Sequence, residues 1–217
     1  MGAPLLATER ELICEYGRRM VADRLVVGTS GNISVRRHDL IAVTPTGIAY
    51  ADLVPDAVAV LDLDGRQVAG DQPPTSEVPL HIELYRTGQR GAIVHTHAPH
   101  ATAVSTLVTE IPPIHYVLAM FGGTVRVAEY ATFGTEALAT SAATALGDGH
   151  GCLLANHGAI TVGGNLAAAY DRALQLEWLC QVWLAARSAG EPRLLPADEV
   201  AMVTEMMRDY GSAGREH

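Results

Sequence analysis

The chain has 217 residues, 48% of them hydrophobic, which is enough to bury a full core and favours one domain over residues 1–217. Lys and Arg total 15 against 24 Asp and Glu, and a formal charge of −9 without a basic block argues against nucleic acid or an anionic membrane surface as partner. Neither a signal-like start nor a long uncharged apolar stretch occurs, so membrane insertion and export are not indicated and the cytoplasm is the expected location.

The first part of the chain predicts one helix and four short strands. Thr8 and Glu11 form a capping-box pattern, and apolar residues then recur at helical spacing as far as Arg24. The segments NISV and LIAVT predict two strands, and AVAVLDLDGRQVAG predicts a hairpin that turns at Asp64 and Gly65. Such short connections favour antiparallel pairing.

A helix and a buried strand come next. We expect Thr75 or Ser76 to cap a helix that carries polar and apolar residues over 77–84. The apolar run at 92–94 then predicts a strand, and a further helix is expected to start near Pro99.

The second half of the chain continues the mixture of strands and helices. HYVLAM and TVRVAEY predict strands, and GCLLANHG with AITVGG predicts a hairpin-like pair. Helices are expected over 135–146, from Asn165 to about Ser188, and over 199–208. Short strands between helices predict an α/β fold, with a single domain built on a central, largely antiparallel sheet flanked by helices.

Three histidines lie within six positions in GAIVHTHAPHA. Side chains two apart on a strand leave the same face, so His95 and His97 are expected to point the same way, near enough for one metal ion. His100 follows Pro99 and is assigned to the next helix. A catalytic zinc usually takes three protein ligands, and His157 at the end of the strand CLLA is the best third candidate. For each histidine alone, an ordinary hydrogen-bonded imidazole is the competing interpretation.

Three segments combine hydroxyl residues with glycine, proline or a helix start: GTSGN at 28–32, TPTG at 44–47 and PTSE at 74–77. Glycine lets a backbone approach a ligand closely, and free N–H groups at a helix start attract phosphate. Each segment alone is also typical of an ordinary turn. Together with the histidines, the segments indicate a site for an anion beside a metal.

The motifs GTSGNISVR, VTPTG, TSE, HTHAPHATAVS, IHYVLA, ATFGT and NHG occur here in the order seen in the class II aldolase/adducin head family, which the chain resembles from about residue 28 to 170. The resemblance implies that His95, His97 and His157 bind Zn²⁺, with Mn²⁺ or Co²⁺ as other possible metals. It implies Glu77 as the catalytic acid/base and Tyr116 as a second catalytic residue reaching the site from a neighbouring subunit. It also places a substrate phosphate among Thr29, Asn32, Thr46, Gly47, Thr75 and Ser76, and assigns the aldehyde end to Phe133 and Tyr210.

The resemblance implies a lyase that reversibly cleaves a ketose 1-phosphate, such as L-fuculose 1-phosphate or a related deoxy sugar phosphate, into dihydroxyacetone phosphate and a small aldehyde such as L-lactaldehyde. The chain contains no lysine, which excludes a lysine Schiff base and agrees with a metal-dependent aldolase. A homotetramer with active sites between subunits is the implied assembly. A sugar-phosphate 4-epimerase, a dehydratase and a non-catalytic adducin-head-like module remain as alternatives on the same scaffold.

Overall fold

The protein is built around one eight-stranded sheet with the strand order β4-β3-β2-β1-β5-β8-β7-β6. The structure, a computed structural model, describes residues 4–210. All strand pairs are antiparallel except β6 with β7, so the predicted fold class is confirmed. The strands are β1 Asn32–Arg37, β2 Leu40–Val43, β3 Ala59–Asp62, β4 Gln67–Ala69, β5 Ala92–Thr96, β6 Val127–Ala128, β7 Gly151–Leu154 and β8 Gly158–Gly163.

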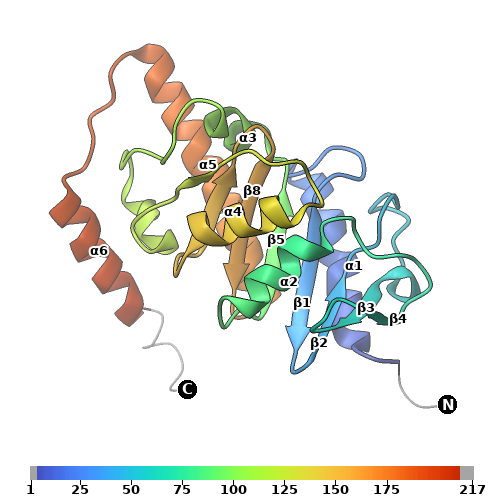
Figure 1. Ribbon diagram of the computed structural model, residues 1–217. Coiled ribbons are helices and arrows are strands. Elements are labelled where there is room, and N and C mark those ends of the chain that lie inside the picture. The colour runs from blue at the N-terminus through green and yellow to red at the C-terminus, as the bar shows by residue number, and fades with distance from the viewer. Residues whose placement is uncertain (1–3, 211–217) are drawn as a thin grey trace.

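Helices cover both faces of the sheet (Figure 1). The α-helices are α1 Ala7–Ala22, α2 Val78–Arg86, α3 Pro99–Ser105, α4 Glu136–Leu146, α5 Leu166–Ala189 and α6 Ala197–Tyr210, with 3₁₀ helices η1 Pro55–Ala57 and η2 Tyr116–Phe121. One face carries α2 and α4, while α1, α3 and α5 pack on the other. Within residues 4–210, no helix combines the length and apolar character needed to cross a bilayer.

The alternation of side chains along β5 divides the core into two layers. Ala92 and Val94 belong to the apolar cluster beneath α1 and α5, whereas Ile93 belongs to the cluster beneath α2 and α4. Because successive side chains on a strand leave opposite faces, His95 lies on the same side as Ile93. The strand therefore presents its histidine toward the start of α2.

Two local predictions about helix starts are wrong. Helix α1 begins at Ala7 with Leu6 as a left-handed N-cap, so Thr8 lies inside the first turn and makes no capping bond. Helix α2 has Glu77 at its N-cap position without a side-chain cap. The Thr75 hydroxyl instead accepts the N–H of Glu77 at 3.3 Å and meets the Asn32 amide.

The apolar run HYVLAM is a 3₁₀ helix and not the expected strand. The imidazole of His115 accepts the N–H of Val117 at 3.1 Å, which caps the first turn, and Gly122 ends the element in a left-handed conformation. A short apolar run does not distinguish a strand from a buried helix, and here the cap and the glycine decide it. The strand predicted from TVRVAEY is reduced to Val127–Ala128.

Candidate active site

The candidate site lies where β1 starts and β5 ends. These two antiparallel strands are neighbours, and Asn32 pairs directly with His95. The N-terminus of α2 brings Glu77 to the same place, and the turn between β7 and β8 brings His157. Residues far apart in the sequence thus meet at one edge of the sheet.

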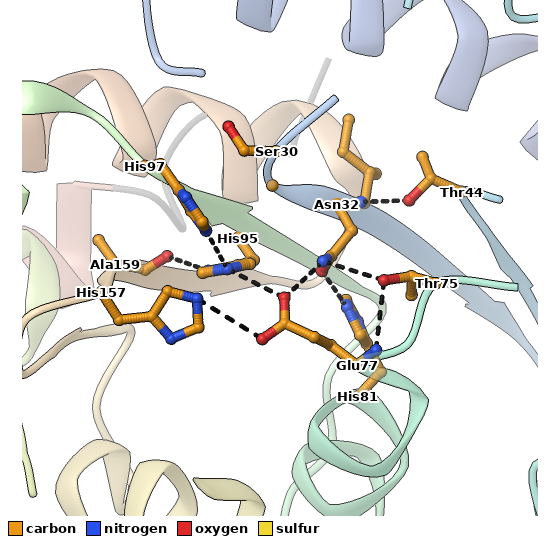
Figure 2. Close-up of polar contacts among 12 residues, drawn as sticks. Ser30, Asn32, Thr44, Thr75, Glu77, His81, His95, His97, His157 and Ala159 are labelled. Atoms are coloured by element: carbon orange, nitrogen blue, oxygen red, sulfur yellow. Dashed lines mark hydrogen bonds and ion pairs between the residues drawn. The ribbon is translucent and has the colours of Figure 1, made fainter. Parts of the chain in front are cut away.

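The three predicted histidines converge (Figure 2). Their ring centroids lie 4.8 to 4.9 Å apart, and Nε2 of His97 is 3.0 Å from Nε2 of His95. Nδ1 of His95 donates to the carbonyl of Ala159 at 3.0 Å, which leaves its Nε2 without a proton in the neutral ring. The predicted common direction of His95 and His97 is confirmed, and His100 lies on α3 as expected.

The turn NHG gives His157 its position. Asn156 adopts the left-handed conformation, with φ of 56°, which asparagine tolerates better than most residues. A Cβ atom on Gly158 would lie 2.1 Å from the carbonyl oxygen of Thr96, so only glycine lets β8 approach β5 this closely. His157, between these two residues, is therefore held beside the other two imidazoles.

The carboxylate of Glu77 is almost completely buried between the histidines and Asn32. Its Oε2 lies 3.1 Å from Nε2 of His95 and accepts the Asn32 amide at 2.8 Å, while Oε1 is 3.7 Å from Nε2 of His157. Burial raises the pKa of this carboxyl, but the charge and hydrogen bond of His95, with help from Asn32 and His157, hold it below its usual range. Glu77 is therefore an ionised acceptor at neutral pH.

The electrostatics of the cluster favour free nitrogen lone pairs on two of its histidines. Burial and the neighbouring imidazoles lower the pKa of His97 to about 3, and burial with the influence of His95 lowers that of His157 to about 4. Burial also acts to lower the pKa of His95, but the charge and hydrogen bond of Glu77 outweigh it and raise that pKa. A carboxylate and three imidazoles in this arrangement can share a cation.

A cavity of about 420 Å³ opens beside the cluster. Its wall includes all three hydroxyl-rich segments, because the strand-like stretches around Pro45 and Pro74 form an antiparallel bridge and the N–H of Thr75 bonds to the carbonyl of Thr44. The third segment ends at Asn32, which is hydrogen-bonded to Thr75. The cavity thus has imidazoles on one side and hydroxyl groups with glycine on another.

The structure brings eleven of the thirteen site residues predicted from the sequence to this place. Of these, His95 lies in the cluster behind the wall, and the others line the cavity: Thr29, Asn32, Thr46, Gly47, Thr75, Ser76, Glu77, His97, His157 and Phe133. Tyr116 does not line the cavity; it is 54% exposed at the start of η2. Tyr210 ends α6, and its side chain lies outside the described part of the structure.

Several residues on the cavity wall were not singled out from the sequence. Ser30 and Gly31 belong to the GTSGN segment, and Asn156 belongs to NHG, so the motifs contained a signal for them. Tyr130 and Ala131 follow β6 and stand close in sequence to Phe133. Tyr130 ends the segment TVRVAEY and Ala131 begins the motif ATFGT, but neither pattern assigned these two residues to the site.

Comparison with known proteins agrees with this fold. The family described as Class II Aldolase and Adducin N-terminal domain matches residues 11–184, and the chain belongs to that family. The protein is a lyase of the class II aldolase group, a group that uses a divalent metal.

Two curated relatives and one solved structure illustrate the similarity. A 5-deoxy-D-ribulose 1-phosphate aldolase of Bacillus thuringiensis serovar kurstaki is 40% identical over 210 residues, covering 95% of this chain and 99% of the relative. The L-fuculose phosphate aldolase of Escherichia coli K12 is 40% identical over 187 residues, covering 85% and 86%. A solved L-fuculose 1-phosphate aldolase has a TM-score of 0.90 at 34% identity, covering 96% of this chain and 98% of that one.

Proposed function

We propose that this protein is a zinc-dependent aldolase that reversibly cleaves a deoxyketose 1-phosphate into dihydroxyacetone phosphate and a short aldehyde, with the whole chain acting as one catalytic domain. The single observation that carries the proposal is the convergence of three imidazoles and Glu77 beside a cavity lined by hydroxyl-rich segments. The names of similar proteins supply two substrate candidates, 5-deoxyribulose 1-phosphate and fuculose 1-phosphate.

The donor set fits a divalent cation. One nitrogen from each of His95, His97 and His157 lies within 4.8 Å of the others, and two ligands of one tetrahedral zinc are about 3.3 Å apart. Oε1 of Glu77 is buried and has no hydrogen-bond partner among the described residues, which is costly unless a cation or substrate faces it. Three imidazoles with a carboxylate nearby favour Zn²⁺, and Co²⁺ or Mn²⁺ suit the same donors. When bound, the metal supplies a Lewis acid that draws electron density from the substrate carbonyl.

The phosphate is assigned to the three hydroxyl-rich segments. Thr29, Thr46, Thr75 and Ser76 supply hydroxyl groups, and Gly47 leaves open space where a Cβ atom would project. No Arg side chain lines this cavity within the described residues, and the chain has no Lys, so neutral donors would hold the anion.

Two proton transfers accompany cleavage of the bond between C3 and C4. The C4 hydroxyl loses its proton as the aldehyde forms, and C3 gains one to give dihydroxyacetone phosphate. We assign the second transfer to Glu77, whose Oε1 faces the histidine cluster: as a carboxylate it takes this proton from C3 during condensation, and in its protonated form it returns the proton during cleavage. The first is assigned to Tyr116 of a neighbouring subunit in a homotetramer, which agrees with a tyrosine exposed on one chain and absent from its own cavity.

The experiment combines metal exchange with product analysis. Protein stripped by a chelator is reloaded with Zn²⁺, Co²⁺, Mn²⁺ or nothing, and incubated with dihydroxyacetone phosphate and either acetaldehyde or L-lactaldehyde. We expect condensation in the metal-loaded samples and none in the stripped one, and kcat/KM ranks the two aldehydes. The reverse assay measures release of triose phosphate. An isomer formed without triose phosphate would indicate an epimerase, loss of water a dehydratase, and failure to bind zinc a non-catalytic module.

A further inference from the structure

A relay of four buried polar side chains leads away from Glu77 into the layer between α2 and β1 (Figure 2 shows its end nearest the site). Its members are Asn32, His81, Ser34 and Tyr85. His81 lies next to Asn32, with 2.5 Å between His81 Nε2 and Asn32 Oδ1. On its other side, Nδ1 of His81 is 2.7 Å from the hydroxyl of Ser34, and that hydroxyl is 2.8 Å from the hydroxyl of Tyr85. All four side chains are buried, with at most 3% exposure.

The direction of every hydrogen bond in this chain follows from its end at Glu77. A carboxylate only accepts, so Asn32 must present its Nδ2 amide to Oε2 of Glu77 and its Oδ1 carbonyl to His81. His81 therefore donates from Nε2 and, being neutral, accepts at Nδ1 from the Ser34 hydroxyl. Ser34 in turn accepts from Tyr85. Every donor and acceptor in these hydrogen bonds is thus assigned, and all four donors point toward Glu77.

Burying these polar groups costs free energy that apolar side chains of similar size would not. Tyr85 is the first donor of the relay, through its hydroxyl bond to Ser34. The Glu77 carboxylate accepts the hydrogen bond at the other end. Asn32 also donates to Thr75 at 3.3 Å, so its amide is committed to the two residues that flank Ser76. The network therefore ends at the Asn32 amide, whose shorter hydrogen bond goes to Glu77.

We propose that Tyr85, Ser34 and His81 are positioning residues: they fix the Asn32 amide so that it holds Oε2 of Glu77 and leaves Oε1 as the proton-carrying atom. The assignment of the proton to Oε1 rests on the proposed function, whereas the direction of the hydrogen bonds does not. Burial lowers the pKa of His81 to about 4, which agrees with a neutral ring.

The relay is tested first by nitrogen NMR of metal-free protein labelled with ¹⁵N-histidine. We expect the histidine signals that vanish in the variant His81→Gln to show a proton on Nε2 and none on Nδ1. In Ser34→Ala, Asn32 Oδ1 still accepts the Nε2 proton of His81, so we expect the tautomer to persist while the Nδ1 signal shifts with the loss of its hydrogen bond. A proton on Nδ1 of His81 in the wild type would overturn the direction of the relay.

Kinetics supply the second test. Loss of groups that orient a reacting residue typically costs about 10-fold to 100-fold in activity, so we expect Ser34→Ala to lower kcat by that factor with KM changed by less than about threefold. Tyr85→Phe removes the last donor and should lower kcat by less. Tyr170→Phe is the matched control, since it removes a hydroxyl bonded to Asp23 from an equally buried ring on the other face of the sheet.

Equal kcat losses in Tyr170→Phe and Ser34→Ala would mean that any buried hydroxyl affects turnover through packing, and would overturn the proposal. A fall in kcat confined to the relay variants would support it. The NMR measurement needs no substrate, so failure of all aldolase assays would remove the proposed function while the tautomer still decides the relay.

Discussion

Gly158 shows how a single residue without a side chain can determine the geometry of the proposed metal site. Its missing Cβ lets the start of β8 lie against the carbonyl of Thr96, one position before His97. Gly31 has a similar part in GTSGN, since a Cβ there would lie 2.7 Å from the carbonyl oxygen of His95. The backbone carbonyls of Thr96 and His95 are thus each packed against a glycine, Gly158 and Gly31 respectively.

We expect Gly158→Ala to push β8 away from β5 and to separate His157 from the other two histidines. Zinc affinity should fall by about 10-fold to 100-fold, the range seen when the surroundings of metal ligands are disturbed. Competition with a chromogenic chelator measures it. Gly164→Ala is the matched control, because a Cβ atom there meets nothing within 4 Å. Equal affinities in the two variants would contradict the role of this contact.

Glu77→Gln tests the proton-carrying residue directly. The amide keeps the size of the side chain but loses its basicity, so we expect turnover to fall by about 10²–10⁴-fold while zinc content stays near that of the wild type. Exchange of C3 hydrogen of dihydroxyacetone phosphate with deuterated water isolates this step from the aldehyde. Exchange at the wild-type rate in the variant would remove Glu77 from the mechanism.

The buried relay was not predicted, because its spacing is visible in the sequence but its assembly is not. Glu77, His81 and Tyr85 recur every four residues on one face of α2, and Asn32 and Ser34 alternate on one face of β1. Each spacing is visible in the sequence. What was missing was the packing of these two faces on each other, which only the tertiary fold provides.

At the scale of elements, α3 starts two residues after His97 and is held by a carboxylate from α5. Oε1 of Glu177 accepts the N–H and the Nδ1 proton of His100, at 3.1 and 2.6 Å, and Oε2 accepts the N–H of Ala101 at 2.8 Å. Free N–H groups in the first turn of a helix need such partners, and a negative charge there is favourable. The clamp formed by Glu177 fixes the backbone immediately beyond the histidine cluster.

Replacing Glu177 with Gln removes the charge and one of the two acceptors. We expect a loss of about 1–2 kcal/mol in the free energy of unfolding and weaker zinc binding. Asn165→Ala is the matched control, because Asn165 caps α5 at the other end of β8 by accepting the N–H of Ala168. Urea unfolding and metal titration compare the two. If both variants lose stability but neither loses zinc affinity, the clamp serves only the helix.

Across the whole molecule, the antiparallel order of the sheet was predictable and the assembly of the site was only partly so. Alternation along one strand placed His95 and His97 on one face. His157 joins them through the pairing of β5 with β8, in which His95 lies opposite Ile160, and that register is a long-range property. The strand predicted from HYVLAM was wrong for a local reason: the cap at His115 favours a helical turn over the strand that the apolar pattern indicated.

Mixing two inactive variants tests whether the site is shared between subunits. If Glu77 and Tyr116 act in one site from different chains, hybrids of Glu77→Gln and Tyr116→Phe contain some intact sites, about a quarter for random assembly of a cyclic oligomer. We expect activity to return when the variants are co-expressed, and light scattering with mass spectrometry confirms the hybrids. Hybrids without activity would place both groups in separate roles or on one chain.

The pairing of Asn32 with His95 has a consequence for engineering of this enzyme. Shifting either strand by one residue would leave the amide and the imidazole on opposite faces of the sheet. The half of the cavity that these two side chains form therefore tolerates little change. Tyr130 and Phe133 lie outside the sheet and are 65% and 64% exposed. Libraries that aim to widen the range of acceptor aldehydes therefore have their greatest freedom at these two positions.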